Sequence, residues 1–325
     1  MERIRPLPYQ MPLVHGESTG SFVTRLAARH GQPVSHLLAT VGEGRSAADV
    51  DPWQSELYLN AAARQRLAAL ARRPLTQLTG ALASLRDEHL LPDGSGAPAY
   101  KWPWRPYSGF VVRGCVLCAA RRGVLDPVWL IRPDPWQICV QHGRFYDIFS
   151  DDRSPFIDLS PGPHVLRAEL RRLQLVRQLG PVGRLPVADA FAVLAHPAMH
   201  LPRLGSSRTA PLRLLPTAIT VACRMARLER LRLDGRLVHD DYRRWREEAH
   251  SDLGWQLGMV LGVWSERHPP LQRSPLPFTR AARPPSRCYW QPGLPHQPAV
   301  PEMAPVDILT CVPWEILAHG PRPYG

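Results

Sequence analysis

Two closely spaced pairs of metal-type side chains constrain this chain more than any other feature. Cys115 and Cys118 are separated by two residues, Cys139 and His142 by two more, and 20 residues lie between the pairs. Two-residue spacing lets one tight turn direct both side chains at a single ion, and the long gap can hold the strands that complete a tetrahedron. The pattern predicts a closed, structural Zn2+ site, because three thiolates and one imidazole leave no position open for catalysis. The alternative is that the four residues are buried side chains that pair by chance.

The other cysteines and the apolar segments indicate the cellular setting. Six cysteines in 325 residues are too few for a disulfide scaffold. The first residues, MERIRPLPYQMPLV, contain three prolines and do not read as a secretory signal. The longest nearly apolar stretches, such as residues 255–264, fall far short of the roughly 20 residues that cross a bilayer. We therefore expect a cytoplasmic protein that has no membrane contact.

The net charge of +12 points to a polyanionic partner. Lys101 is the only lysine among the 40 basic residues, and a GC-rich genome explains that ratio of arginine to lysine. It does not explain the excess of cations over anions. Arginine suits phosphate geometry, so we expect contact with DNA and association with the nucleoid.

Several classes of enzyme are excluded by missing motifs. Lys101 stands between Tyr100 and Trp102, so the chain has no Gly-Lys-Ser/Thr phosphate loop, and it lacks HExxH and GxGxxG. The densest acidic group, Asp240 and Asp241, is better explained as the first turn of a helix than as a metal site. The chain is predicted not to be an enzyme.

Residues 1–91 are predicted to form helical hairpins. One helix is expected after Ser18 or Thr19 and ends at Gly31, and the next opens at Pro33 and stops at Gly42. The pattern of residues 25–38 recurs at 66–79 with six identities in 14 positions. Each hairpin resembles a helix-turn-helix, which can place its second helix in a DNA groove. Packing of the hairpins on each other or on a partner protein is an equally good reading.

The whole chain is predicted to be mainly α. We expect a zinc-ribbon module over residues 92–150 and a helical domain over residues 151–268, followed by a Pro-rich, loop-rich tail over residues 269–325 that contains 14 of the 36 prolines. In the helical domain, Leu166, Leu170, Leu173 and Val176 indicate one amphipathic helix. Thr217 and Ser251 are expected to cap two others, and Cys223 is expected to lie in a core.

Basic and polar side chains near these elements are candidates for contact with nucleic acid. Arginines that only form a solvated face are the competing interpretation. The candidates are Arg73 and Gln77 in the second hairpin, Arg121, Arg122 and Arg144 around the cysteines, and Arg167, Arg171 and Arg172 off the apolar stripe.

Two local patterns together carry a resemblance to a known family. GESxxSFxxRLA at Gly16 to Ala27, followed by CxxC, a Trp-rich middle and CxxHG, resembles the TniQ (TnsD-like) family of transposition target-selection proteins. The resemblance covers about residues 8–150 and implies an adaptor. Such an adaptor recruits an AAA+ ATPase of the TnsC type, which engages a transposase, and it finds its target by binding DNA or by joining an RNA-guided complex. The resemblance also implies Cys115, Cys118, Cys139 and His142 as zinc ligands.

The same resemblance places the ATPase-binding surface in the segment from Pro12 to Leu38. Within this segment, the expected partner-binding residues are Glu17, Ser18, Phe22 and Arg25. Residues 181–325 match nothing in the short members of the family. A stand-alone zinc-containing DNA-binding regulator is therefore the competing function.

Overall fold

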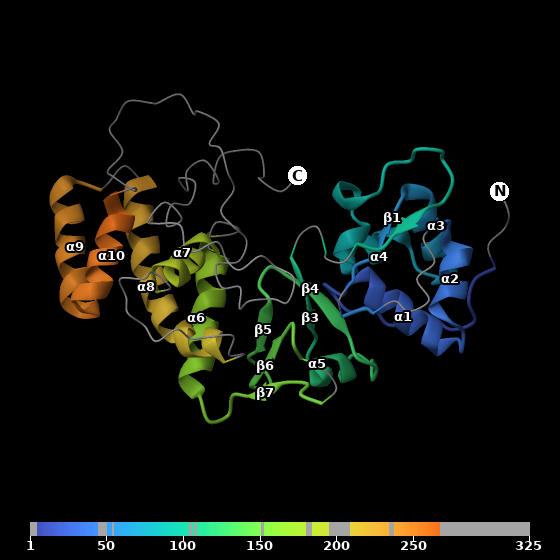
Figure 1. Cartoon of the computed structure of the whole chain (residues 1–325), viewed down its shortest axis with the longest axis horizontal. Helices are drawn as coiled ribbons and strands as arrows, with labels where there is room; N and C mark the ends of the chain where they lie inside the picture. The colour runs from blue at the N-terminus through green and yellow to red at the C-terminus, as the bar shows by residue number, and fades with distance from the viewer. Residues whose placement is uncertain are drawn as a thin grey trace. The chain divides into compact units, whose positions relative to one another are not determined.

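The structure is a computed structural model of the 325-residue chain. It describes residues 5–44, 51–53, 55–103, 106, 109–150, 153–179, 184–194, 209–233 and 237–266. The chain divides into two compact units, Met1–Asp158 and Leu159–Gly325. Helices predominate in the described part (Figure 1), which confirms the predicted mainly α class. The division into four domains stays a prediction, and the Pro-rich tail lies outside the described residues.

Unit 1 begins with two pairs of short helices. Helix α1 (Thr19–Arg29) starts at the N-cap Ser18, whose side chain accepts a hydrogen bond from the Ser21 backbone N–H at 3.0 Å. Helix α2 (Val34–Val41) follows Pro33 and ends before Gly42, as predicted. The second pair comprises α3 (Ala61–Leu70) and α4 (Leu75–Ala81).

The two pairs repeat one backbone design. Pro74 precedes α4 as Pro33 precedes α2, because a fixed φ suits the entry to a helix. Gly31 and Arg72 occupy equivalent turn positions, and both have positive φ, 62° and 54°. The predicted repeat is therefore present in the structure as two pairs of helices, α1 with α2 and α3 with α4. Whether the pairs act as DNA-binding helix-turn-helix units stays a prediction.

One apolar core holds the four helices together. Phe22 and Leu26 of α1, Leu37 of α2, Leu67 of α3 and Leu78 of α4 are all buried in this core. Strands β1 (Tyr58–Leu59) and β2 (Tyr100–Lys101) pair beside it, and two 3₁₀ turns, η1 (Ala83–Leu85) and η2 (Asp87–His89), follow α4.

The rest of unit 1 is a small β module built from two antiparallel sheets. Strand β3 pairs with β4, and β5 pairs with β6, which pairs with β7 (Figure 1). The sheets are tied by Gln137, which donates to the Arg113 carbonyl at 2.6 Å and accepts from the Arg132 guanidinium at 2.9 Å. The elements are β3 (Phe110–Arg113), α5 (Val116–Ala120), β4 (Trp129–Arg132), β5 (Trp136–Cys139), β6 (Arg144–Asp147) and β7 (Ile157–Asp158).

Unit 2 consists of packed helices in the described range. Helix α8 packs on α6 and α7, and α10 packs on α9 and α7. Inside this unit, Trp264 donates its indole N–H to the buried Asp189 carboxylate at 2.9 Å. The helices are α6 (Pro163–Leu179), α7 (Arg184–Leu194), α8 (Ala210–Leu233), α9 (His239–Leu253) and α10 (Trp255–Glu266). None of the described helices combines the length and apolar character that a bilayer crossing requires.

Two predicted helix starts in unit 2 were wrong. Helix α8 begins at Ala210 rather than Thr217 and continues through Pro216, because Leu212 and Leu215 extend the buried apolar face that Ile219 continues. Ser251 lies inside α9 and caps nothing, since Gly254 with φ 83° ends that helix.

The predicted environments of two other residues in unit 2 were also wrong. Helix α6 buries Val165, Ala168 and Leu175, whereas Leu170 is 53% exposed. The apolar stripe predicted from the sequence therefore lies beside the buried face of α6: Leu166, Leu173 and Val176 are half-buried and Leu170 is exposed. Cys223 is exposed on α8, so it is not a core residue.

Candidate metal centre and its support

Helix α5, strand β5 and the turn that leads to β6 bring the predicted cluster together. Cys115 occupies the N-cap position of α5 and Cys118 lies in the first turn of this helix, so a short helix fixes the first pair. Cys139 is the last residue of β5, and His142 lies in the turn to β6, which Gly143 closes with φ 60°. The tight turns expected from the two-residue spacings are therefore present.

The four donor atoms lie within 4.8 Å of one another. The His142 Nδ1 atom is 3.4 Å from the Cys115 Sγ, 3.3 Å from the Cys118 Sγ and 3.4 Å from the Cys139 Sγ, and the two latter sulfurs are 3.5 Å apart. Around a tetrahedral Zn2+ with bonds of about 2.0 to 2.3 Å, ligand atoms are separated by roughly 3.4 to 3.8 Å. The donor set and its spacing thus fit a tetrahedral metal ion.

The thiols are electrostatically coupled to one another. Hydrogen bonding with Cys139 lowers the pKa of the Cys115 thiol to about 4, against the opposing effect of burial. The same contact, together with burial, raises the pKa of Cys139. A single deprotonated thiol thus makes the next deprotonation harder, and a cation held between the sulfurs would relieve that repulsion.

The segment Gly16–Ser21, called the GES segment below, docks the β module on the helices. The Ser18 backbone N–H donates to the Trp129 carbonyl at 2.8 Å, and the Ile131 N–H donates to the Gly16 carbonyl at 2.8 Å. The Trp129 N–H in turn donates to the Ser21 hydroxyl at 3.0 Å. This segment therefore pairs with β4, the strand between the two cysteine pairs, and joins the helical pairs to the cluster module.

Glu17 and Arg25 form an ion pair inside this junction. The guanidinium donates from Nε to the Glu17 Oε1 at 2.8 Å and from Nη2 to Oε2 at 2.7 Å, and the Ser21 hydroxyl also donates to Oε1. Burial raises the pKa of Glu17, while Arg25 and Ser21 oppose that shift. The pair lies where the backbone of Glu17 bridges to both Leu82 and Leu130.

Glu56 is a structural residue that sequence reasoning missed. Its Oε1 accepts hydrogen bonds from the backbone N–H groups of Thr19 at 2.8 Å, Gly20 at 3.3 Å and Leu57 at 2.8 Å, so the carboxyl group of Glu56 holds the start of α1. Burial raises the pKa of Glu56 to about 8. The only sequence signal was a lone acid beside the apolar run Leu57 to Leu59, which is too weak to identify it.

The four expected partner-binding residues are interior. Glu17, Ser18 and Phe22 are fully buried, and Arg25 is 3% exposed. Their contacts join the helices to the β module, so in this structure they build the domain and do not form a surface. The exposed side chains of the segment Pro12–Leu38 include Arg29 and His36, and the partner surface predicted there stays a prediction.

The candidate nucleic-acid residues separate into two groups. Arg73 donates to the Met11 carbonyl at 2.8 Å, Arg144 lies 4.0 Å over the Phe156 ring, and Arg172 makes two 2.7 Å hydrogen bonds to Glu169. These three are engaged within the chain. The exposed candidates are Gln77 on α4, Arg121 and Arg122 after α5, and Arg167 and Arg171 on α6.

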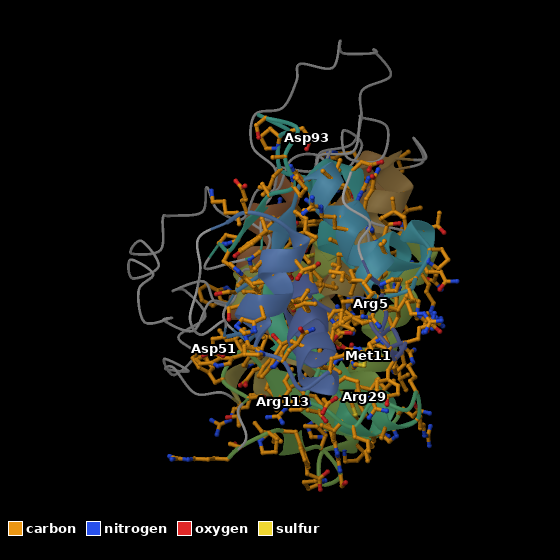
Figure 2. All side chains as sticks on the ribbon, turned by 90° about the vertical axis from the view of Figure 1, so that its right-hand side faces the viewer. Arg5, Met11, Arg29, Asp51, Asp93 and Arg113 are labelled. Atoms are coloured by element: carbon orange, nitrogen blue, oxygen red, sulfur yellow. The ribbon has the colours of Figure 1, made fainter. Side chains whose placement is uncertain are left out.

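The side chains of unit 1 are drawn in Figure 2, where Met11 and Arg113 are labelled. Arg113 is the last residue of β3 and is 6% exposed, with its guanidinium 5.7 Å from the centre of the Trp129 ring. The strand that precedes Cys115 is thus packed against the strand that docks on the GES segment.

Together these features define a helical protein whose N-terminal unit is organised around a Cys3His cluster. Residues 8–145 match the family model TniQ, so this part of the chain is a TniQ domain. The matched range contains both helical pairs, the GES junction and all four cluster residues. TniQ domains are associated with the selection of transposition targets, and the family consists of non-catalytic adaptors. The chain matches no curated protein and no solved structure.

Proposed function

We propose that this protein is a transposition target-selection adaptor that contacts nucleic acid or a targeting complex and recruits an AAA+ ATPase of the TnsC type. The TniQ match over residues 8–145 carries this proposal. On this reading, nucleotide hydrolysis and strand transfer are the work of the ATPase and the transposase. The targeting complex is either DNA-bound protein or an RNA-guided assembly.

The cluster in unit 1 is proposed to hold structural Zn2+. Cys115, Cys118, Cys139 and His142 supply the three thiolates and the imidazole that this ion prefers. The ion would contribute folding free energy of order 10 kcal/mol, as in small zinc modules. Because Trp129 of β4 pairs with Ser18 and Ser21, the ion would also stabilise the junction with the helices.

A pull-down from the host extract tests the adaptor function. The tagged, zinc-loaded protein is incubated with extract that has been treated with nuclease or left intact, and the retained proteins are identified. An AAA+ ATPase that survives nuclease treatment supports the proposal. Retention of DNA from the intact extract, with no such ATPase retained from either extract, contradicts it and favours a stand-alone DNA-binding regulator.

A pair of variants tests the expected recruitment surface. Arg29→Ala combined with His36→Ala changes two exposed side chains of the Pro12–Leu38 segment and is expected to reduce retention of the ATPase. Arg243→Ala on α9, an exposed arginine of unit 2, is the control. Equal retention by both variants would remove this segment from the recruitment surface.

A further inference from the structure

The outer face of α6 is basic along its whole length. Every exposed residue of this helix falls on one side, and none of them is acidic. Glu169, the single acid of α6, is buried and paired with Arg172 on the opposite side. The exposed side chains that can contact a ligand are His164, Arg167, Leu170, Arg171, Gln174, Arg177 and Gln178.

The three exposed arginines are available for an outside partner. Among the residues that the structure describes, no carboxylate pairs with Arg167, Arg171 or Arg177. Arg171 lies near α8, where its guanidinium opposes the rise that partial burial causes in the pKa of the Cys223 thiol. Cys223 is itself exposed on α8.

Charge is distributed unevenly among the helices of unit 2. The sequences of α6 and α8 contain nine arginines and two glutamates, whereas those of α9 and α10 contain three arginines and six acids. The net charge of the whole chain therefore does not account for this pattern. A polyanion would meet α6 and α8 and would be repelled by α9 and α10.

The shape and chemistry of the α6 face select one kind of polyanion. A helix of about 10 to 12 Å diameter fits the B-DNA major groove, which is about 12 Å wide. Arginine contacts phosphates and guanine, glutamine can bond adenine, and Leu170 could contact a thymine methyl. The face has no Phe, Tyr or Trp side chain of the kind that single-strand binders use for stacking. The deep, narrow groove of duplex RNA does not admit side chains.

We propose that the exposed face of α6 is a duplex DNA-binding surface that lies in the major groove. This inference rests on the proposed function and assigns its DNA contact to unit 2, which lies outside the residues matched by the family. Arg167 and Arg171 contact phosphate or base edges, and Gln174 and Gln178 lie one and two turns further along the same face. Arg172 has a structural role through Glu169.

The test compares two double variants that change the net charge equally. Arg167→Gln with Arg171→Gln removes two cations from the α6 face, and Arg243→Gln with Arg244→Gln removes two exposed cations from α9. Binding of the full-length, zinc-loaded chain to a labelled 30-base-pair duplex of mixed sequence is measured by fluorescence anisotropy over a range of salt concentrations. Helix content by circular dichroism shows that both variants remain folded.

The α6 variant is expected to bind about tenfold more weakly or worse, and the slope of log K against log salt is expected to fall by roughly two. The α9 variant is expected to bind at least as tightly as the wild type. Equal weakening of both variants, or none, would overturn the assignment to α6 and leave the adaptor function standing. A wild-type chain that fails to bind the duplex would overturn both this assignment and direct DNA contact in the proposed function. Recruitment of the ATPase is read separately in the pull-down.

Discussion

Arg25 donates two hydrogen bonds to the carboxylate of Glu17, from Nε at 2.8 Å and from Nη2 at 2.7 Å, inside the junction between the helices and the β module. The two side chains are 3% and 0% exposed. They belong to the GESxxSFxxRLA pattern by which the sequence resembles TniQ proteins. This part of the pattern therefore specifies buried contacts between α1 and the β module within the domain.

Arg25→Met is expected to destabilise the protein by about 3 kcal/mol or more, because it leaves the Glu17 carboxylate buried without its counter-charge. Urea unfolding at pH 7 measures the change. Arg243→Met is the matched control, since Arg243 and Asp240 are 3.5 Å apart with 63% and 79% exposure. Removing that pair should cost less than about 1 kcal/mol. Similar losses in both variants would show that the buried pair has no special role.

Glu56 is expected to make stability fall as pH rises. Its folded-state pKa of about 8 lies above the ordinary value of 4.5 for a glutamate, so between these values the folded state holds a proton that the unfolded state has released. The contribution is full below pH 4.5, is lost progressively up to about pH 8, and changes by at most about 1.4 kcal/mol per pH unit.

Glu56→Gln should remove this slope, because the amide oxygen can still accept the three N–H groups and carries no titrating proton. Thermal or urea unfolding between pH 5.5 and 8.5, with zinc in excess, gives the difference between the wild type and the variant. Glu88 is exposed, so the control variant Glu88→Gln should show the same dependence of stability on pH as the wild type. Parallel pH profiles for the wild type and Glu56→Gln would refute the assignment.

Cys139→Ser is expected to abolish stoichiometric metal binding and to destabilise unit 1 by several kcal/mol, since the remaining three ligands hold Zn2+ weakly. Metal per chain by elemental analysis and the unfolding temperature measure the effect. Cys223→Ser changes an exposed thiol on α8 and should leave both values unchanged. One zinc per chain in Cys139→Ser, with the wild-type unfolding temperature, would rule out the proposed site.

Gly109→Ala is expected to destabilise the antiparallel β3–β4 pair by about 2 kcal/mol or more. The backbone there has φ 131°, and an added Cβ would overlap the Arg132 carbonyl oxygen. Gly80→Ala offers the opposite case, because Gly80 lies in α4 with no atom within 4 Å of its added Cβ. That exchange should stabilise the protein by up to about 1 kcal/mol. Chemical unfolding measures the change in the free energy of unfolding for each variant. Changes of the same sign in both variants would contradict the prediction.

Local chemistry made part of this protein readable from the sequence alone. Pro33, Gly31 and Ser18 set the bounds of α1 and α2, since caps and turns act within a few residues. The same holds for the cysteine pairs, whose two-residue spacings predict the turns that bring Cys115 and Cys118, and Cys139 and His142, together. The repeat at 41 residues likewise predicted the second pair of helices.

Tertiary packing decided which polar residues are interior and which helix faces are buried. Glu56 acts on α1 across 37 residues of sequence, and Ser21 meets Trp129 across 108. No local pattern signals such contacts, so Glu17 and Arg25 read as surface residues until the β module covers them. On α6 the leucines permit more than one buried face, and only packing against α7 and α8 selects the face that leaves Arg167, Arg171 and Arg177 exposed.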